Sequence, residues 1–245
     1  MKILITNDDG NQKPGIAHLT KVMEHFGQVY VVAPENDQSG TSHSLTLHEP
    51  LKFRKSKENQ YVVDGTPADC IHFAIHHLWQ KEEFDLCVSG INHGANIGDD
   101  VWYSGTLGGA IEAALNGIPS MAISMLPDEE NMFHFERAVS FLKGWFENHI
   151  STLWPHDVVP SMNIPPHFHK DEFRYTRLGP KRYLSHIDVR DDLRGNQYFW
   201  IGGTLDDLGA EQGTDSHALA NQFVSVTPLN LDVTHVAYLE KWLKK

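Results

Sequence analysis

Short apolar runs alternate with amphipathic segments along the first part of the chain. The runs are typical of buried strands and cover residues 2–6, 29–33, 61–64, 85–89 and 120–125. Between them, apolar residues recur every three or four positions and predict helices that begin at Pro14, at Thr66, near 106 and near 133. This alternation predicts an α/β fold with a mainly parallel sheet that helices cover on both faces.

The pattern changes after about residue 160. Shorter segments with strand character follow, at 173–178, 183–189, 197–201 and 222–226. An amphipathic stretch at 233–243 predicts a terminal helix. Since no low-complexity linker interrupts the chain, we interpret 1–245 as one domain. In it, 1–160 form the core, and 161–245 form a β-rich extension with a hairpin arm and the terminal helix.

The composition and net charge of the chain argue against nucleic-acid polymers and membranes as partners. The 245 residues include 32 acidic and 20 basic side chains, so the net charge is −12 with neutral histidines. A general affinity for nucleic-acid polymers or anionic membranes needs clustered Lys and Arg, so we expect neither partner. The opening apolar run is too short for a signal peptide, and no run approaches the roughly 18 residues that span a bilayer.

The cysteines and histidines add little chemistry of their own. Cys70 and Cys87 lie in apolar segments without the spacing of a metal site, so we expect them to be buried and reduced in a cytoplasmic protein. The 16 histidines are scattered along the chain, and we expect no zinc site.

The first candidate site follows the first strand, where Asp8 and Asp9 are adjacent. Neighbouring carboxylates repel unless a cation lies beside them, and oxygen ligands suit a hard ion such as Mg²⁺, Mn²⁺ or Ca²⁺. Gly10 lets the chain bend so that both side chains can reach one ion. An ordinary turn, with an aspartate that caps the next helix, is an equally good interpretation of this motif alone.

Two further loops carry polar residues after predicted strands. Ser39 offers a weak hydroxyl ligand, although a plain polar loop explains its surroundings better. The segment 89–106 is richer, because its glycines permit close backbone approach and Asn92 and Asn96 supply amide groups. Ser104, Gly105 and Thr106 lie at a predicted helix start, where free backbone N–H groups favour a phosphate.

Seven blocks of the sequence match a known family in order along nearly the whole chain. The chain resembles the stationary-phase survival protein SurE, a family of divalent-metal-dependent 5′(3′)-nucleotidases. The blocks are ITNDDG (5–10), PGI (14–16), VVAPENDQSGTSHSLTL (31–47), GTPADC (65–70), SGINHGANIGDDVWYSGTLGGAIEA (89–113), RGNQYFWIGG (194–203) and GTDSHALANQFVSVTPL (213–229). The segments 128–138 and 149–172 have no pattern that matches.

The resemblance implies a Rossmann-like three-layer core and a homodimer or homotetramer that assembles through the β-hairpin and a C-terminal exchange. It also implies one divalent cation, Mg²⁺ or Mn²⁺, per subunit. Carried over by motif, the metal ligands are Asp8, Asp9, Ser39 and Asn92. The residues on the phosphate side are Asn96, Ser104, Gly105 and Thr106.

The reaction expected from this resemblance is hydrolysis of nucleoside 5′- and 3′-monophosphates, with short polyphosphate as a further substrate. A metal-activated water attacks the phosphoryl group, and Asp8 or Asp9 orients or deprotonates that water. Asn96, Ser104 and Thr106 stabilise charge on the phosphoryl oxygens. A non-catalytic module that binds nucleotide and metal for regulation is the alternative, because it would keep the same loops.

Overall fold

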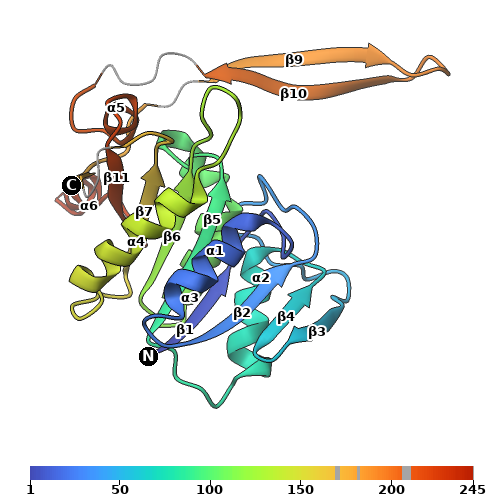
Figure 1. The fold of residues 1–245 in the computed structure, drawn as a ribbon. Coiled ribbons are helices and arrows are strands. Elements are labelled where there is room, and N and C mark those ends of the chain that lie inside the picture. Colours follow the sequence, from blue (N-terminus) through green and yellow to red (C-terminus); the bar gives the residue numbers. More distant parts are fainter. Residues whose placement is uncertain (169–171, 181–182, 206–210, 245) are drawn as a thin grey trace.

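The computed structural model describes residues 1–168, 172–180, 183–205 and 211–244. One sheet of nine strands in the order β3-β4-β2-β1-β5-β6-β7-β11-β8 runs through the described residues (Figure 1). Its strands are β1 (Lys2–Thr6), β2 (Gln28–Pro34), β3 (Phe53–Lys57), β4 (Gln60–Val63), β5 (Leu86–His93), β6 (Ser120–Met125), β7 (Val158–Ile164), β8 (Phe173–Tyr175) and β11 (Val224–Asn230). The six strands from β4 to β7 are parallel to one another, as predicted.

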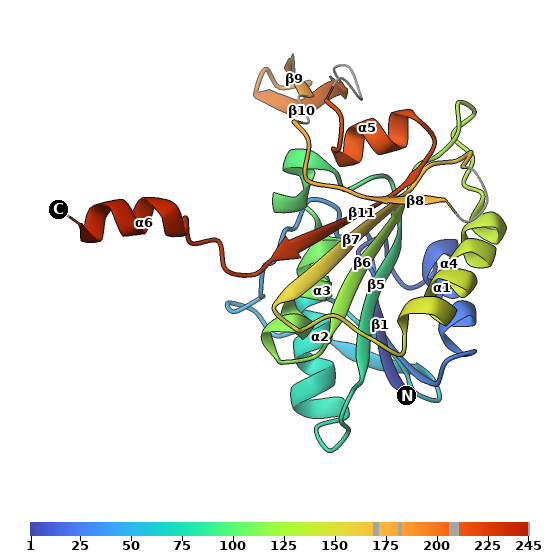
Figure 2. The same ribbon diagram turned by 90° about the vertical axis from the view of Figure 1, so that its left-hand side faces the viewer.

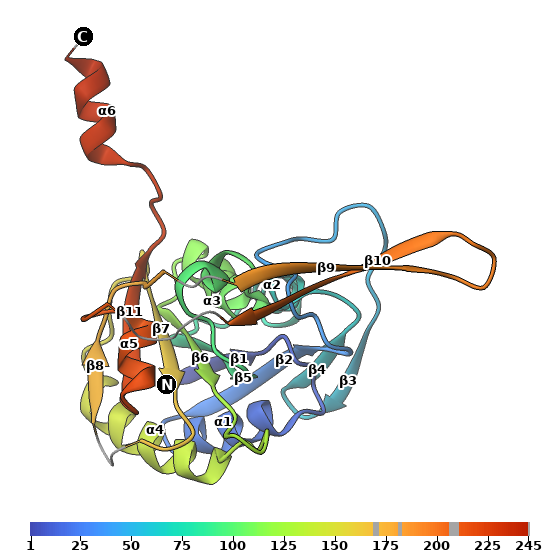
Figure 3. The ribbon, with the colours of Figure 1, turned by 90° about the horizontal axis from the view of Figure 1, so that it is seen from above.

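Helices cover both faces of this sheet, which confirms the three-layer α/β fold. Figures 2 and 3 show α1 and α4 on one face and α2 and α3 on the other. The helices of the described residues are α1 (Pro14–Met23), α2 (Pro67–Phe73), α3 (Gly105–Leu115), α4 (Phe135–His149), α5 (Asp215–Ala220) and α6 (Val236–Leu243).

Strand β1 shows why the central strands are continuous apolar runs. Ile3 and Ile5 pack into the core under α1 and α4, whereas Leu4 between them packs into the core under α2. All three side chains are fully buried. Since successive side chains of a strand point to opposite faces, a strand covered on both faces needs an apolar residue at every position.

Local signals set where the helices begin. The Thr66 hydroxyl accepts from the Asp69 N–H (3.1 Å), and the Asp69 carboxylate accepts from the Thr66 N–H (2.9 Å), which makes a capping box for α2. Ser104 caps α3 by accepting from the Leu107 N–H at 3.1 Å. Pro14 opens α1.

The structure corrects several predicted boundaries. Strand β5 continues to His93, where the sequence predicted a loop from residue 90, because Gly90 and Ile91 are buried within the sheet. The predicted helix after Thr66 is α-helical only to Phe73 and continues as a π-helical turn, Ala74–Leu78. The later elements also differ: 173–178 shortens to β8, 222–226 shifts to β11, and the terminal helix begins at Val236.

Two strands of the sheet had no counterpart in the prediction. Strand β3 lies at the edge of the sheet, and each of its residues is exposed, so its sequence FRKSK lacks an apolar alternation. Strand β7 is buried but carries Pro160, Ser161 and Asn163, which interrupt its apolar run. Polar residues inside a strand hide it from a search for hydrophobic runs.

The predicted hairpin arm is present and projects from the body of the molecule (Figures 1 and 3). It pairs β9 (Tyr183–Asp191) with β10 (Gln197–Leu205) as a separate antiparallel ribbon. Helix α6 also extends away from the sheet, and none of its residues is buried. No helix in the described part of the chain is long and apolar enough to cross a membrane.

Candidate active site at the carboxyl edge of the sheet

The strand order places a ligand site between β1 and β5. From β1 the chain moves outward to β2 and β4 on one side, then returns to lay β5 against the other side of β1. In open parallel sheets, ligands bind outside the carboxyl ends of the strands where the strand order reverses in this way. Asp8 and Asp9 follow β1 at this point, and Asn92 lies at the carboxyl end of β5.

Asp8 is buried and bonded to the first turn of α3. Its Oδ1 accepts a hydrogen bond of 2.6 Å from the Thr106 hydroxyl, 98 residues later in the chain. Its backbone oxygen accepts from the Gln38 N–H at 2.8 Å. Burial raises the pKa of the Asp8 carboxyl from 3.8 to about 6, against the lowering effect of the Thr106 hydrogen bond. The protein therefore holds a carboxylate here at a cost in stability.

Asp9 lies beside β5. Its Oδ2 accepts from the backbone N–H of His93 (3.1 Å) and lies 2.8 Å from Nδ1 of the same residue. The His93 ring in turn packs edge-on against Phe133 and Phe135. The first and third polar loops of the sequence therefore meet, as expected from the ends of neighbouring parallel strands.

The predicted phosphate residues join the same network. The Asn96 side-chain amide donates to Ser124 Oγ at 2.8 Å and to Thr106 Oγ1 at 3.3 Å. The Thr106 hydroxyl in turn donates a hydrogen bond to Asp8, so Asn96, Thr106 and Asp8 form one chain of hydrogen bonds. All three residues are buried. Polar groups fixed in this way are preorganised to meet a charged ligand.

Gly105 brings the start of α3 against Asp8. A Cβ atom at this position would lie 2.9 Å from Asp8 Cβ and 2.9 Å from Thr41 Oγ1. A side chain is therefore excluded, and the first turn of α3 approaches the carboxylate closely enough for the Thr106 backbone to bond it. Thr41 places the second polar loop at the same spot.

Ser39 and Asn92 have other partners within this region. The exposed Ser39 hydroxyl donates to Asp37 Oδ1 at 2.6 Å, although its neighbour Gln38 is bonded to the backbone of Asp8. The Asn92 amide nitrogen donates to the Gly94 oxygen at 2.8 Å, which leaves the Asn92 side-chain oxygen outside that bond. Both residues lie on segments that border the Asp8–Asp9 pair.

The donor chemistry of this site fits a hard cation. Asp8 and Asp9 are 3% and 6% exposed, and the ion pairs found for them in the described residues involve the His93 ring alone. Two adjacent buried carboxylates need compensating positive charge beside them. The side-chain oxygen of Asn7 is also buried and has no hydrogen-bond partner among the residues that the structure describes. An oxygen-rich pocket of this kind suits Mg²⁺ or Mn²⁺.

Such an ion would not be held by charged residues alone. Among the described residues, no three His, Cys, Asp or Glu side chains are grouped so that they could hold a metal. The two aspartates would therefore need neutral oxygen donors, and water would complete the shell, as Mg²⁺ commonly retains it.

Two residues from the second half of the chain position the site and were not among the predicted site residues. Asn163 on β7 accepts from the Asn96 N–H (2.8 Å) and donates to the Asn96 oxygen (3.1 Å). Asp215 at the start of α5 accepts from the Gly98 N–H (2.9 Å) and the Gly179 N–H (2.8 Å). No strand was predicted around Asn163, so the sequence offered no signal for it. Asp215 had no signal beyond its place in the matched block 213–229.

An apolar cavity adjoins the phosphate-side residues. It has a volume of about 800 Å³ and includes Ser104 in its wall. Other lining residues come from the 3₁₀ turn Gly98–Trp102, from α3 and from β11, among them Val101, Trp102, Ile111, Leu115 and Leu229. This size and lining are typical of a site for a small organic ligand.

In α/β proteins that act on phosphorylated ligands, the ligand typically lies where the strand order of the parallel sheet reverses, beside a helix N-terminus. Here this point also carries two acidic side chains. The family model "Survival protein SurE" matches residues 3–185. The chain belongs to this SurE family. The resemblance and the Rossmann-like fold are thereby confirmed.

Relatives cover the chain from end to end. A protein of Pelobacter propionicus named "5′-nucleotidase SurE" is 42% identical over 98% of this chain and 97% of its own length. A Vibrio vulnificus protein of the same name is 39% identical over 100% of this chain and 96% of its own. The crystal structure of the SurE protein from Aquifex aeolicus superposes with a TM-score of 0.86, at 38% identity over 100% of both chains.

Proposed function

We propose that this chain, an enzyme of the 5′-nucleotidase class by its family, hydrolyses nucleoside 5′-monophosphates to nucleoside and phosphate with one divalent cation, Mg²⁺ or Mn²⁺. We extend the proposal to nucleoside 3′-monophosphates and short polyphosphate. The observation that carries it is the pair of adjacent buried carboxylates, of which Asp8 is bonded to the first turn of α3 and Asp9 to the end of β5. Negative charge and phosphate-binding donors in one place suit a metal-bridged phosphate.

In this proposal, Asp8, Asp9, Ser39 and Asn92 would hold the cation. The ion, when bound, supplies Lewis-acid polarisation of the phosphoryl group and a more acidic water. Asp8 or Asp9 would orient the attacking water and accept its proton. The hydrogen-bond chain from Asn96 through Thr106 to Asp8 keeps that carboxylate in place.

The phosphate would lie on the first turn of α3. Ser104, Gly105 and Thr106 begin this helix, and Asn96 contacts it from the preceding loop. Their hydroxyl, amide and backbone donors would stabilise charge on the phosphoryl oxygens, which is most of what phosphoryl transfer requires. The nucleoside would occupy the apolar cavity, since Ser104 borders both regions.

Metal removal gives the direct test. Purified protein treated with EDTA is expected to release no phosphate from nucleoside 5′-monophosphates, and added Mn²⁺ or Mg²⁺ is expected to restore release. Parallel reactions with 3′-monophosphates and short polyphosphate rank the substrates. Nucleotide binding without turnover under either metal would overturn the proposal in favour of the non-catalytic regulatory module.

A second prediction concerns the close approach at Gly105. In the variant Gly105→Ala, the added methyl group must displace Asp8 or Thr41, so kcat/KM is expected to fall roughly 10- to 100-fold. Gly144→Ala on α4 is the matched control, because nothing lies within 4 Å of its added Cβ. Equal activity of the two variants would contradict the placement of the reaction at this end of α3.

We also propose that copies of the chain assemble through the projecting arm. Register places Ile187, Val189, Phe199 and Ile201 on one face of the hairpin, and each is at least half exposed. An isolated hairpin is marginal in water, and an apolar face of this kind is typical of an interface. A homodimer or homotetramer would cover it, together with the apolar residues of α6.

We further propose that residues 1–245 form one domain and that the protein acts in the cytoplasm. Strands β7, β8 and β11 from the second half pair within the sheet that holds β1, which supports a single domain. Cys70 and Cys87 are free and buried, and burial raises the pKa of both thiols. Inert reduced thiols are typical of a reducing compartment.

A further inference from the structure

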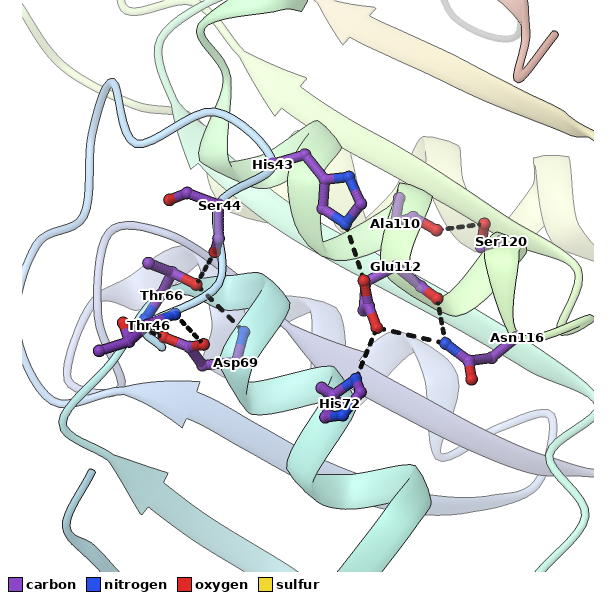
Figure 4. A network of polar contacts seen from close by, with 10 residues as sticks. All are labelled: His43, Ser44, Thr46, Thr66, Asp69, His72, Ala110, Glu112, Asn116 and Ser120. Carbon is purple, nitrogen blue, oxygen red and sulfur yellow. Dashed lines mark hydrogen bonds and ion pairs between the residues drawn. The ribbon is translucent and has the colours of Figure 1, made fainter. Parts of the chain in front are cut away.

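Glu112 is a buried carboxylate on α3 that lies outside the site described above (Figure 4). Its side chain is 7% exposed and contacts two histidines from different parts of the chain. His43 Nε2 lies 2.8 Å from Oε2, and His72 Nδ1 lies 2.9 Å from Oε1. The hydrogen bond with His43 is the main cause that lowers the pKa of Glu112 to about 2, so the group is a carboxylate at neutral pH.

His43 belongs to the segment 38–46, which lies along α3 without regular secondary structure. Its neighbour Ser42 donates from the backbone to the Tyr103 oxygen (3.0 Å) and from the hydroxyl to the Trp102 oxygen (2.7 Å). A Cβ atom on Gly108 would overlap the Ser42 backbone, so the segment rests directly on the helix. At its far end, Thr46 Oγ1 donates to Asp69 Oδ2 at 2.7 Å.

The same segment reaches the carboxylate pair at its other end. Gln38 bonds the backbone of Asp8, Ser39 follows it, and Thr41 contacts the space beside Gly105. Segment 38–46 therefore connects the wall of the site to Glu112 over a short length of chain. A shift of the segment on α3 would change the shape of the site.

We propose that Glu112 is a positioning residue that, through His43, holds the segment 38–46 against α3 and so sets the affinity of the site for its phosphorylated substrate. This inference rests on the proposed function for its kinetic consequence. His72, the second histidine bonded to Glu112, serves as the control for His43. His72 contacts the same carboxylate from α2, a helix that contributes no residue to the site.

The experiment compares His43→Ala with His72→Ala in the full-length, metal-loaded protein. His43→Ala is expected to raise KM for a nucleoside 5′-monophosphate roughly tenfold and to leave kcat within about twofold, because it removes the charge-assisted hydrogen bond to Glu112 and also a side chain from the wall of the apolar cavity. The residues that line this cavity do not include Glu112, so a rise in KM in Glu112→Gln isolates the positioning effect. His72→Ala removes an equivalent bond and is expected to change KM less than about twofold. Equal KM values for the two variants would overturn the proposal.

A second measurement does not depend on activity. Leu45 and Leu47 are 40% and 77% exposed, so chymotrypsin can report how firmly this stretch is held. His43→Ala is expected to be cleaved there faster than wild type under native conditions, and His72→Ala at the wild-type rate. Glu112→Gln, which keeps the shape and loses the charge, is expected to lie between His43→Ala and wild type in both assays.

The outcomes separate this inference from the proposed function. If wild-type protein hydrolyses no nucleotide, the proposed function fails, and the cleavage rates still decide whether His43 anchors the segment. If hydrolysis occurs but cleavage rate and KM are the same in His43→Ala and His72→Ala, only the positioning role of Glu112 fails.

Discussion

Replacing Asp8 by asparagine is expected to lower kcat/KM on the order of a thousandfold or more, because the change removes a carboxylate from the proposed metal site and from the hydrogen-bond chain to Asn96. The amide has nearly the same shape, and its oxygen can still accept from the Thr106 hydroxyl, now 2.6 Å from Asp8 Oδ1. The loss would therefore be chemical rather than a collapse of the site. Phosphate release from a nucleoside 5′-monophosphate measures it.

The same variant is expected to be at least as stable as wild type in metal-free buffer. Burial disfavours the Asp8 carboxylate, and its removal relieves that cost. A thermal unfolding midpoint equal to or above that of wild type, together with the loss of activity, would distinguish a functional carboxylate from a structural one. Asp157→Asn, a change at an exposed position directly before β7, is the control and should alter neither quantity.

The sign of the pH dependence follows from the direction of the shift. A carboxyl group with a pKa of 3.8 unfolded and about 6 folded binds protons more tightly in the folded state. Its contribution favours folding at acid pH, and that contribution is lost as pH rises from about 4 to about 6. Metal-free wild type should therefore lose stability over this interval relative to Asp8→Asn. Parallel pH profiles for the two proteins would contradict the burial of an ionised Asp8.

The second large effect is expected on assembly. Phe199→Glu with Ile201→Glu places two charges on the apolar face of the hairpin, where these side chains are 62% and 80% exposed in the single chain. If the face is buried between copies, each change removes about 1.5–3 kcal/mol of apolar burial and adds a buried charge. The association constant should fall by two orders of magnitude or more. Sedimentation velocity across a concentration series would show the oligomer dissociate.

Asp188→Lys serves as the control for this experiment. Asp188 lies opposite Trp200 on the other face of the same hairpin, so the variant changes charge without touching the apolar face. It should sediment as wild type does. A wild-type monomer at all concentrations, or a double variant that remains fully assembled, would contradict assembly through this face.

Local sequence carries much of the fold. The strands β1, β2, β5 and β6 appear as apolar runs because the sheet is buried on both faces, and the capping box at Thr66 marks the start of α2. Strand β7 escaped prediction because polar residues interrupt it, and two of these, Ser161 and Asn163, are nevertheless buried. Asn163 bonds Asn96, which lies 67 residues earlier in the chain, so no local pattern predicts this contact.

The candidate site likewise combines local motifs, which are visible in the sequence, with contacts that only the fold creates. Adjacent Asp8 and Asp9, the Asn-rich loop and the Ser104–Thr106 helix start are local motifs, and they were visible in the sequence together with the family they resemble. The hydrogen bond from Thr106 to Asp8 joins residues 98 positions apart in the chain, and the one between Asn96 and Asn163 joins residues 67 positions apart. They depend on the order of strands in the sheet and on the packing of α3 against it.

Local patterns along the chain were enough to predict the alternating α/β core, the projecting hairpin and the family. Periodicity, caps and motifs act over a few residues and survive without any knowledge of tertiary contacts. Long-range packing, in contrast, brings β7 and β11 into the main sheet and places His43 and His72 on the same carboxylate, Glu112. Such contacts arise when chain segments far apart in sequence pack together. Polar groups that become buried there are stable only when they hydrogen-bond to one another.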